Sequence, residues 1–233
     1  SKMWRLQPTI VFLGPYHAST YPLWAPGRRR VVIPYGIADT FRTAEPATET
    51  PPPRAIFVSN PLRGLDWLLD VWTKRIRPKM PTAELHLFTG AATYGEVGSA
   101  KAREMIAVMD QARARSGEGV VLRPPIPKNQ LAAELRAARV MLYRGDLNET
   151  FCLAVGEAQA MGVPAVVQDL GSVVERVCDQ LTGFVARDEG TFATAALRLL
   201  GDDALWRSQH EAAIMTQRTW GWPEAAARFE ELI

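Results

Sequence analysis

Short runs of apolar residues recur along the chain, and each is bounded by glycine, proline or polar residues. Two runs near the N-terminus, residues 10–13 and 31–33, are rich in β-branched side chains, which is typical of buried strands. Beyond residue 54 the runs become regular. They predict strands at residues 55–59, 85–89, 120–123, 140–143 and 165–168, followed by a short one at 183–186.

Apolar side chains between these runs recur with the spacing of a helix. One such face is formed by Leu65, Leu68, Leu69 and Trp72, and similar faces include Met105 and Leu131. Because strand and helix alternate, we expect an α/β fold, a Rossmann-like parallel sheet with helices on both faces. Ligands of such sheets bind at the carboxyl ends of the strands. Residues 191–233 are predicted to be helical with a break at 220–223, where Pro223 suits the first turn of a new helix.

The segment 44–53 interrupts this pattern. It holds four prolines and no aliphatic side chain larger than alanine, so it neither packs a core nor continues a helix. The interval between the first two strands is also rich in proline and leaves little room for a long helix. We therefore predict two units, residues 1–43 and residues 44–233.

Composition narrows the class of protein. Hydrophobic residues make up 47% and charged residues 22%, which is ordinary for a globular domain. No apolar run approaches the ~20 residues of a membrane-spanning helix. Lys and Arg outnumber Asp and Glu by only 27 to 25, so no overall field favours nucleic acid as a partner.

Cysteine and histidine give no sign of a metal site. Cys152 and Cys178 fall in predicted helices without a CxxC spacing, which indicates reduced thiols in a cytoplasmic protein. The three histidines lie far apart in sequence, and no motif with ligand spacing is present. The run from Arg28 to Arg30 is consistent with contact at an acidic membrane surface, although a solvated loop is the simpler interpretation.

The most informative segment lies between the predicted strands 140–143 and 165–168. It begins Asn148-Glu149-Thr150 and ends with Gly162, a helix stop, and Pro164 just beyond. We expect Glu149 in the loop above the strand and Glu157 about two turns into the helix. A carboxylate pair so spaced suits a nucleotide sugar better than a single reacting bond.

A simpler interpretation stays open for both glutamates. Glu149 could be a first-turn carboxylate favoured by the helix dipole, and Glu157 a solvated helix position. Against it, Glu157 is flanked by small and apolar residues, where a charge is rarely left without a partner. Gly156 in the middle of the helix costs ~1 kcal/mol relative to alanine, which makes sense where a backbone or ligand approaches closely.

These residues resemble a known family. Glu149-Thr-Phe-Cys-Leu-Ala-Val-Gly-Glu157 looks like the Glu-x7-Glu motif of retaining glycosyltransferases of the GT-B fold, family 4 (group 1). Further landmarks of that family occur in the right order from about residue 31 to the end. They are Val32-Ile33-Pro34-Tyr35-Gly36-Ile37, Arg63-Gly64-Leu65, Gly171-Ser-Val-Val-Glu175, Thr182-Gly183-Phe184-Val185 and Trp222.

The resemblance implies roles for individual residues. Glu149 would approach the donor sugar and act as the catalytic residue, and Glu157 would bind the ribose of the nucleotide. Arg63 and Asn60 would lie at the donor diphosphate, and backbone N–H groups would be presented at the helix N-terminus. Those N–H groups belong to Thr150, Phe151 and Cys152. With this positive field no metal or other cofactor is expected.

The resemblance also implies a division of labour between two domains. Residues 1–43 would be a fragment of the N-terminal acceptor domain with the connection, and residues 44–233 the nucleotide-sugar-binding C-terminal domain. A nucleotide-sugar donor would be the partner of this chain, and the acceptor, a saccharide, lipid or other hydroxyl compound, would be bound mainly by the missing N-terminal domain. The fragment alone is then expected to be inactive.

Departures from the family pattern keep two other functions open. Ser59-Asn60-Pro61 stands where many members have an arginine, so one phosphate cation is missing or comes from Arg144 or the absent domain. Phe151-Cys152 replaces a frequent Phe-Gly, and the loop 123–127 has three prolines where the family's backbone reads the base. The alternatives are a related GT-B enzyme, such as an epimerase or phosphorylase, and a non-catalytic nucleotide-sugar-binding module.

Overall fold

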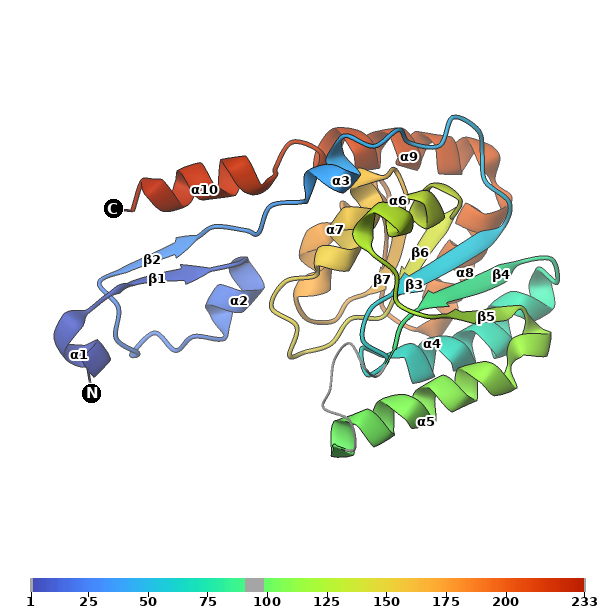
Figure 1. Cartoon of the computed structure of the whole chain (residues 1–233), viewed down its shortest axis with the longest axis horizontal. Helices are drawn as coiled ribbons and strands as arrows, with labels where there is room; N and C mark the ends of the chain where they lie inside the picture. The colour runs from blue at the N-terminus through green and yellow to red at the C-terminus, as the bar shows by residue number, and fades with distance from the viewer. Residues whose placement is uncertain (1, 91–98, 233) are drawn as a thin grey trace.

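A computed structural model describes residues 2–90 and 99–232, so residues 91–98 and 233 of the second predicted unit lie outside the described ranges. The chain forms a small arm and a larger sheet-bearing part (Figure 1). The arm holds α1 (Lys2–Leu6), β1 (Thr9–Phe12), α2 (Pro15–Ser19) and β2 (Arg29–Val32), and β1 and β2 pair in parallel. The division of the chain into acceptor and donor units stays a prediction.

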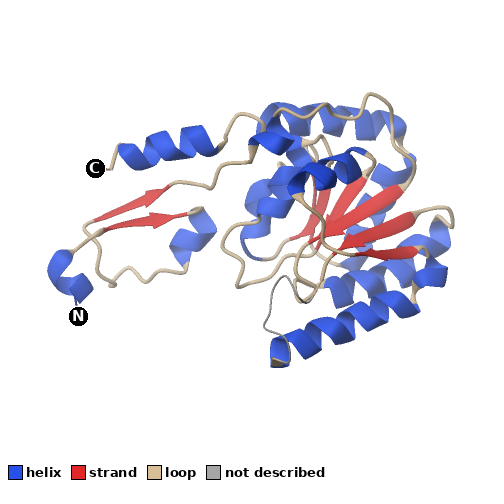
Figure 2. Ribbon diagram, viewed as in Figure 1, coloured by secondary structure: helices blue, strands red, loops and turns tan. Residues whose placement is uncertain are grey.

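The larger part is built on one parallel sheet of six strands (Figure 2). The strands lie in the order β5-β4-β3-β6-β7-β8, and every neighbouring pair is parallel. The order reverses between β3 and β6, which makes this crevice the topological switch point of the sheet. The strands are β3 (Arg54–Val58), β4 (Glu84–Phe88), β5 (Val120–Arg123), β6 (Val140–Tyr143), β7 (Ala165–Gln168) and β8 (Gly183–Ala186).

Helices cover both faces of this sheet, as the sequence pattern predicted (Figure 1). One face carries α4 (Leu65–Val71), which runs on as η1 (Trp72–Ile76) and η2 (Arg77–Lys79), together with α5 (Ala100–Ala114) and α8 (Glu189–Gly201). The other face carries α3 (Asp39–Arg42), α6 (Lys128–Arg136), α7 (Leu153–Ala160) and α9 (Asp203–Gln217). Two further short turns, η4 (Ser116–Glu118) and η5 (Gly171–Arg176), lie in the connections. The core between the layers is apolar and continuous, and includes Phe57, Trp72 and Phe192, all 0% exposed.

The ends of several helices follow from local chemistry. The Asp188 side chain accepts from the N–H of Thr191 at 2.8 Å and so caps α8, and Asp202 caps α9 by accepting from Leu205 at 3.0 Å. The break between α8 and α9 is one that our single predicted stretch 191–233 missed. The predicted break at 220–223 is confirmed, because α10 (Trp222–Glu230) begins there with Pro223 in its first turn.

The chain crosses between the arm and the sheet twice, and the two crossings touch. Ile37 donates from its N–H to the carbonyl of Trp220 at 3.2 Å, and Trp220 donates from its indole N–H to the carbonyl of Pro34 at 3.2 Å. A Cβ on Gly36 would lie 2.1 Å from the carbonyl carbon of Gly221, so only glycine allows this approach. From there α10 extends back in the direction of the arm (Figure 1).

Candidate functional site

A cleft of about 450 Å³ opens at the carboxyl ends of β3, β4 and β5, beside the loop that follows β6. This is the edge of the sheet where a ligand was expected, next to the switch point between β3 and β6. The cleft holds both glutamates of the motif. Its lining residues are Val58, Ser59, Phe88, Pro125, Ile126, Lys128, Leu131, Glu149, Phe151, Leu153, Ala154 and Glu157.

Glu157 lies on α7 with its side chain only 9% exposed. Lys128, at the start of α6, donates from Nζ to Glu157 Oε1 at 2.6 Å. Burial raises the pKa of Glu157, and the ammonium of Lys128 opposes that rise. The interpretation of Glu157 as a solvated helix position is therefore wrong, and the partner expected for a buried charge is Lys128.

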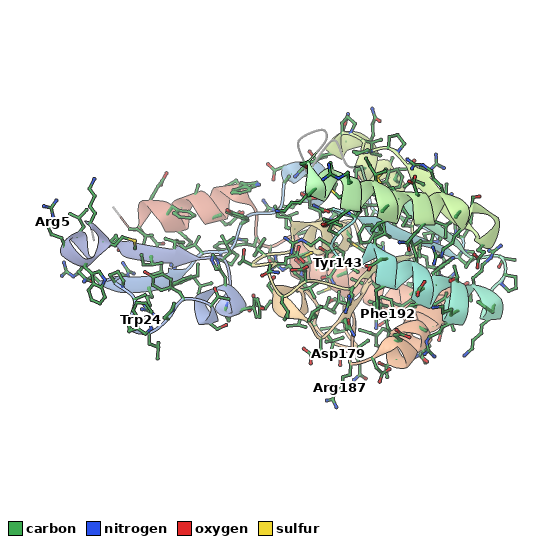
Figure 3. The ribbon with its side chains drawn as sticks, turned by 90° about the horizontal axis from the view of Figure 1, so that it is seen from below. Arg5, Trp24, Tyr143, Asp179, Arg187 and Phe192 are labelled. Atoms are coloured by element: carbon green, nitrogen blue, oxygen red, sulfur yellow. The ribbon has the colours of Figure 1, made fainter. Side chains whose placement is uncertain are left out.

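Glu149 lies in the loop that follows β6, and its carboxylate contacts the last residue of that strand, Tyr143. The hydroxyl of Tyr143 is 3.0 Å from Oε1 and 3.0 Å from Oε2 of Glu149. Burial raises the pKa of Glu149, while the Tyr143 hydrogen bond and the charge of Arg63 lower it. Tyr143 itself is fully buried, at the end of β6 and toward the side of the larger part that faces the arm (Figure 3).

Helix α7 begins later than the sequence suggested. Its first residue is Leu153, so Glu157 is little more than one turn into the helix, and Cys152 is the residue that precedes it. Thr150, Phe151 and Cys152 belong to the loop, whose shape is fixed by the Tyr143–Glu149 contact and by a turn in which Glu149 donates from N to the carbonyl of Asp146. Cys178 also lies outside a helix, just after η5.

The N–H groups of this loop remain available to a ligand. Within the described ranges the backbone N–H groups of Thr150, Phe151 and Cys152 donate no hydrogen bond to the protein. The first N–H groups of α7 lack intrahelical acceptors for geometric reasons. Phe151 lines the cleft and is backed by the guanidinium of Arg176 at 4.4 Å from its ring, whereas the Cys152 side chain is 1% exposed and packs in the core.

The two predicted phosphate-binding residues of the β3 loop have partners within the protein. Arg63 forms an ion pair with Asp146 at 3.1 Å, and the Asn60 side chain accepts from the N–H of Leu62 at 2.9 Å. Neither lines the cleft. Arg144 donates from Nε to Gln168 at 3.1 Å and lies 5.3 Å from the Trp67 ring, so it too points away from the glutamates.

Sequence reasoning missed three of the groups that hold the site. Lys128 and Tyr143 are the partners of the two glutamates, and Ser59 contacts the hydroxyl of Tyr143 at 3.3 Å. Lys128 follows the proline-rich loop 123–127, and its position at the start of a helix beside the expected ligand edge was the only signal available. Tyr143 looked like any apolar strand residue.

A second cavity lies apart from the two glutamates. A cavity of about 500 Å³ lies at the outer edge of the sheet along β8 and α8, but neither glutamate lines it. Among the described residues no cluster of three His, Cys, Asp or Glu side chains has the geometry of a metal site, and no helix is long and apolar enough to cross a membrane. Independence from metal and a cytoplasmic location stay predictions.

The chain is similar in sequence to glycosyltransferases. A family model described as "Glycosyl transferases group 1" matches residues 52–202. D-inositol 3-phosphate glycosyltransferase from Frankia alni is 30% identical over 213 residues, which cover 86% of this chain and 51% of that protein. The enzyme of the same name from Streptomyces avermitilis is 34% identical over 118 residues, 50% of this chain and 25% of that protein.

Solved structures share the fold at low sequence identity. Sucrose-phosphate synthase from Thermosynechococcus elongatus superposes with a TM-score of 0.76 at 20% identity, over 99% of this chain and 59% of that one. A pneumococcal O-GlcNAc transferase in complex with UDP and GlcNAc gives 0.72 at 15% identity, over 99% of this chain and 46% of that one. The chain thus spans about half, or less, of the length of the curated relatives cited here.

Proposed function

The chain belongs to the group 1 glycosyl transferases, and on that premise we propose that its cleft binds a nucleotide-diphosphate sugar. The sugar is then transferred, with retention of its anomeric configuration as in family 4, to a hydroxyl group of a saccharide, lipid or other acceptor. The observation that carries this proposal is the pair Glu149 and Glu157 in one cleft at the carboxyl ends of the central strands.

The surroundings of each glutamate suit a different part of the donor. Glu157 is nearly buried, and among the described residues only its Oε1 has a hydrogen-bond partner, so Oε2 suits a ribose hydroxyl. Glu149 lies in the loop above β6 and faces the reacting sugar. Between them the N–H groups of residues 150–152, which donate no hydrogen bond within the described part of the chain, offer donors to the diphosphate. The start of α7 adds the positive end of the helix dipole.

Arg63 takes part by exchanging partners. Its guanidinium is paired with Asp146, and both side chains are about one-third exposed. A surface pair of this kind contributes only about 0–1 kcal/mol, so a diphosphate can replace Asp146 at little cost. We propose this exchange for Arg63, with Asn60 shaping the loop that presents it through its contact with Leu62.

The acceptor side lies beyond this chain in our proposal. The arm is a parallel sheet of only two strands, and parallel sheets are otherwise covered on both faces. Leu23 and Trp24 on the arm are 94% and 75% exposed, and Trp24 projects from it in Figure 3. We propose that a further α/β domain continues the arm, binds the acceptor and closes over the donor cleft. This chain alone then binds donor without transferring it.

The test is calorimetry of the 233-residue chain with the diphosphates of uridine, guanosine and adenosine and with the matching nucleotide sugars. Glu157→Ala should weaken diphosphate and nucleotide sugar alike by about 10- to 150-fold, the equivalent of ~1.5–3 kcal/mol for a hydrogen bond to a charged group. Glu149→Ala should leave diphosphate binding within about threefold and lower turnover of the full-length protein. Glu134→Ala is the matched control, because Glu134 lies on α6, pairs with Arg54 at 3.8 Å and does not line the cleft.

Two results would refute these assignments. If Glu149→Ala abolished diphosphate binding while Glu157→Ala had no effect, the roles of the two glutamates would be wrong. If the 233-residue chain alone transferred sugar through many turnovers, the acceptor site would lie within it and the proposal of a further domain would fail.

A further inference from the structure

A chain of hydrogen-bonding groups runs beneath the cleft from one strand end to the next. Tyr143 is the last residue of β6, and its hydroxyl contacts both oxygens of Glu149 at 3.0 Å. Ser59, just after β3, places its Oγ 3.3 Å from the same hydroxyl. Thr89, just after β4, donates from Oγ1 to the carbonyl of Ser59 at 2.6 Å. Three neighbouring strands of the sheet therefore converge on one carboxylate.

We infer that Tyr143 is a positioning residue for Glu149: its single phenolic hydrogen, shared between the two carboxylate oxygens, holds the ionised carboxylate in one orientation toward the donor sugar. This inference rests on the proposed role of Glu149. Tyr143 does not touch the substrate, because it is 0% exposed and does not line the cleft. Its effect on the reaction is transmitted through the carboxylate.

The chemistry of the three groups allows one direction of hydrogen bonding when Glu149 is ionised. A carboxylate only accepts, so the phenol hydrogen must go to Glu149. The oxygen of Tyr143 is then left to accept from the hydroxyl of Ser59. Burial raises the pKa of Tyr143 well above its ordinary value, which keeps the phenol protonated and therefore a donor.

The phenol is also fixed in place. Its ring stacks on Phe57 of β3, with centroids 5.8 Å apart and planes at 18°, and no part of it reaches solvent. Glu149, by contrast, belongs to a loop with no helix or strand of its own. A contact from the sheet therefore gives a loop carboxylate the precision that catalytic geometry requires, since small misplacements of reacting groups cost rate.

The two glutamates of the cleft are held in opposite ways, which supports the inference. The partner of Glu157 is Lys128, whose side chain is 56% exposed and can swing away to admit a ligand. Glu149 is held by the hydroxyl of Tyr143 and by the side chain of Cys152, both of which are buried. Glu157 can thus exchange Lys128 for a ligand, whereas Glu149 keeps its contact with Tyr143 throughout the reaction.

The experiment is Tyr143→Phe, which retains the ring and its packing and removes only the hydroxyl. In the full-length protein we expect kcat to fall by about tenfold or more, as for a lost hydrogen bond to a charged group, with the donor KM within about threefold. Burial and the charge of Asp146 raise the pKa of Glu149, whereas the Tyr143 phenol, the charge of Arg63 and the Cys152 side chain lower it. Removal of the phenol should therefore raise that pKa and move the acid limb of the pH–rate profile to higher pH. Carboxyl-carbon NMR titration of the 233-residue chain should show the same rise at Glu149 without any assay of activity.

Two further variants make the test specific. Tyr21→Phe removes a phenolic hydroxyl that donates to the carbonyl of Pro26 at 2.8 Å in the arm, and should change neither kcat nor the pKa of Glu149. Ser59→Ala removes the contact between Ser59 and the Tyr143 hydroxyl. It should change kcat and the pKa of Glu149 in the same directions as Tyr143→Phe, but by smaller amounts. A Tyr143→Phe protein with unchanged kcat and an unchanged pKa of Glu149 would overturn the inference. Loss of stability alone, without either shift, would also overturn it.

The proposed function and this inference fail in different ways. If Glu149→Ala leaves turnover intact, the assigned role of Glu149 is wrong and Tyr143 has nothing to position. If Glu149→Ala abolishes turnover while Tyr143→Phe behaves like the Tyr21→Phe control, the role of Glu149 stands and the inference alone is wrong.

Discussion

Replacing Lys128 by methionine removes the partner of Glu157 but keeps a side chain of similar length. The lost contact joins Nζ and Oε1 at 2.6 Å, and the carboxylate side chain is 9% exposed. A hydrogen bond to a charged group is worth ~1.5–3 kcal/mol, and because Lys128 is itself half exposed, solvent screening reduces this. We expect Lys128→Met to lower the free energy of unfolding by about 1–2 kcal/mol at pH 8.

The stability lost in Lys128→Met should increase with pH as Glu157 becomes ionised. The folded-state pKa of Glu157 is raised above its ordinary value of 4.5, so the stability of the fold falls as pH rises from about 4.5 through the folded pKa. Lys128 opposes the rise in pKa, so Lys128→Met raises it further and extends that fall to higher pH. Where Glu157 is protonated in both proteins the ion pair no longer adds to the difference in stability, and only the loss of the Lys128 contact with the Phe41 ring, 5.7 Å from Nζ, remains. The difference reaches its full value once Glu157 is ionised in both.

The measurement is urea unfolding followed by the fluorescence of the seven tryptophans, at pH 4.5 and at pH 8. Lys74→Met is the matched control, because Lys74 contacts Asp70 at nearly the same distance, 2.7 Å, but with side chains 69% and 44% exposed. An exposed pair one helical turn apart contributes only ~0.3–0.5 kcal/mol. Our reasoning is refuted if Lys128→Met costs no more than Lys74→Met, or if its cost is the same at both pH values.

Two further predictions follow from features of the same site. The dissociation constant of the donor, measured by calorimetry, should change by less than about twofold when EDTA is added, because N–H groups and Arg63 supply the positive charge that the diphosphate needs. Loss of binding that is restored by magnesium or manganese would contradict this. Gly156→Ala should destabilise the protein because the new Cβ would lie 2.8 Å from Cδ1 of Ile37. The Ile37→Val protein lacks that atom, so there the better helix propensity of alanine should make Gly156→Ala stabilising by up to ~1 kcal/mol. Urea unfolding of the four proteins checks the sign in each background, and the same sign in both would exclude this contact as the cause.

Strand positions were predictable from sequence because each strand of the parallel sheet is buried by helices on both sides. Residues 120–123, 140–143, 165–168 and 183–186 were predicted at their observed bounds, and β1, β3 and β4 were predicted one residue late at each end. β2 was predicted as residues 31–33 but spans Arg29–Val32, so its start was missed by two residues. The close approach at Gly156 was also predicted, although the approaching group is the Ile37 side chain rather than backbone or ligand. The fold class followed from alternation alone.

The start of α7 and the partners of the glutamates were beyond the reach of local pattern. Asn148 and Thr150 are both residues that favour a helix start, but the helix begins at Leu153 because tertiary contacts shape the loop before it. Tyr143 contacts Glu149 once β6 is part of the sheet, and Lys128 contacts Glu157 once α6 packs on the face of the sheet. An apolar strand position and an exposed lysine carry no mark of such a contact in the sequence.

The touching crossings at Gly36 and Gly221 have a consequence for the order of folding. The hydrogen bond from Trp220 to Pro34 joins residues 186 apart in a chain of 233. Contacts of such long range form late, because the entropy of closing a large loop is offset only after other contacts have brought its ends together. The six-stranded sheet and its helices provide those contacts. We therefore expect the arm and α10 to be joined last, after the sheet and the cleft at the ends of its strands have formed.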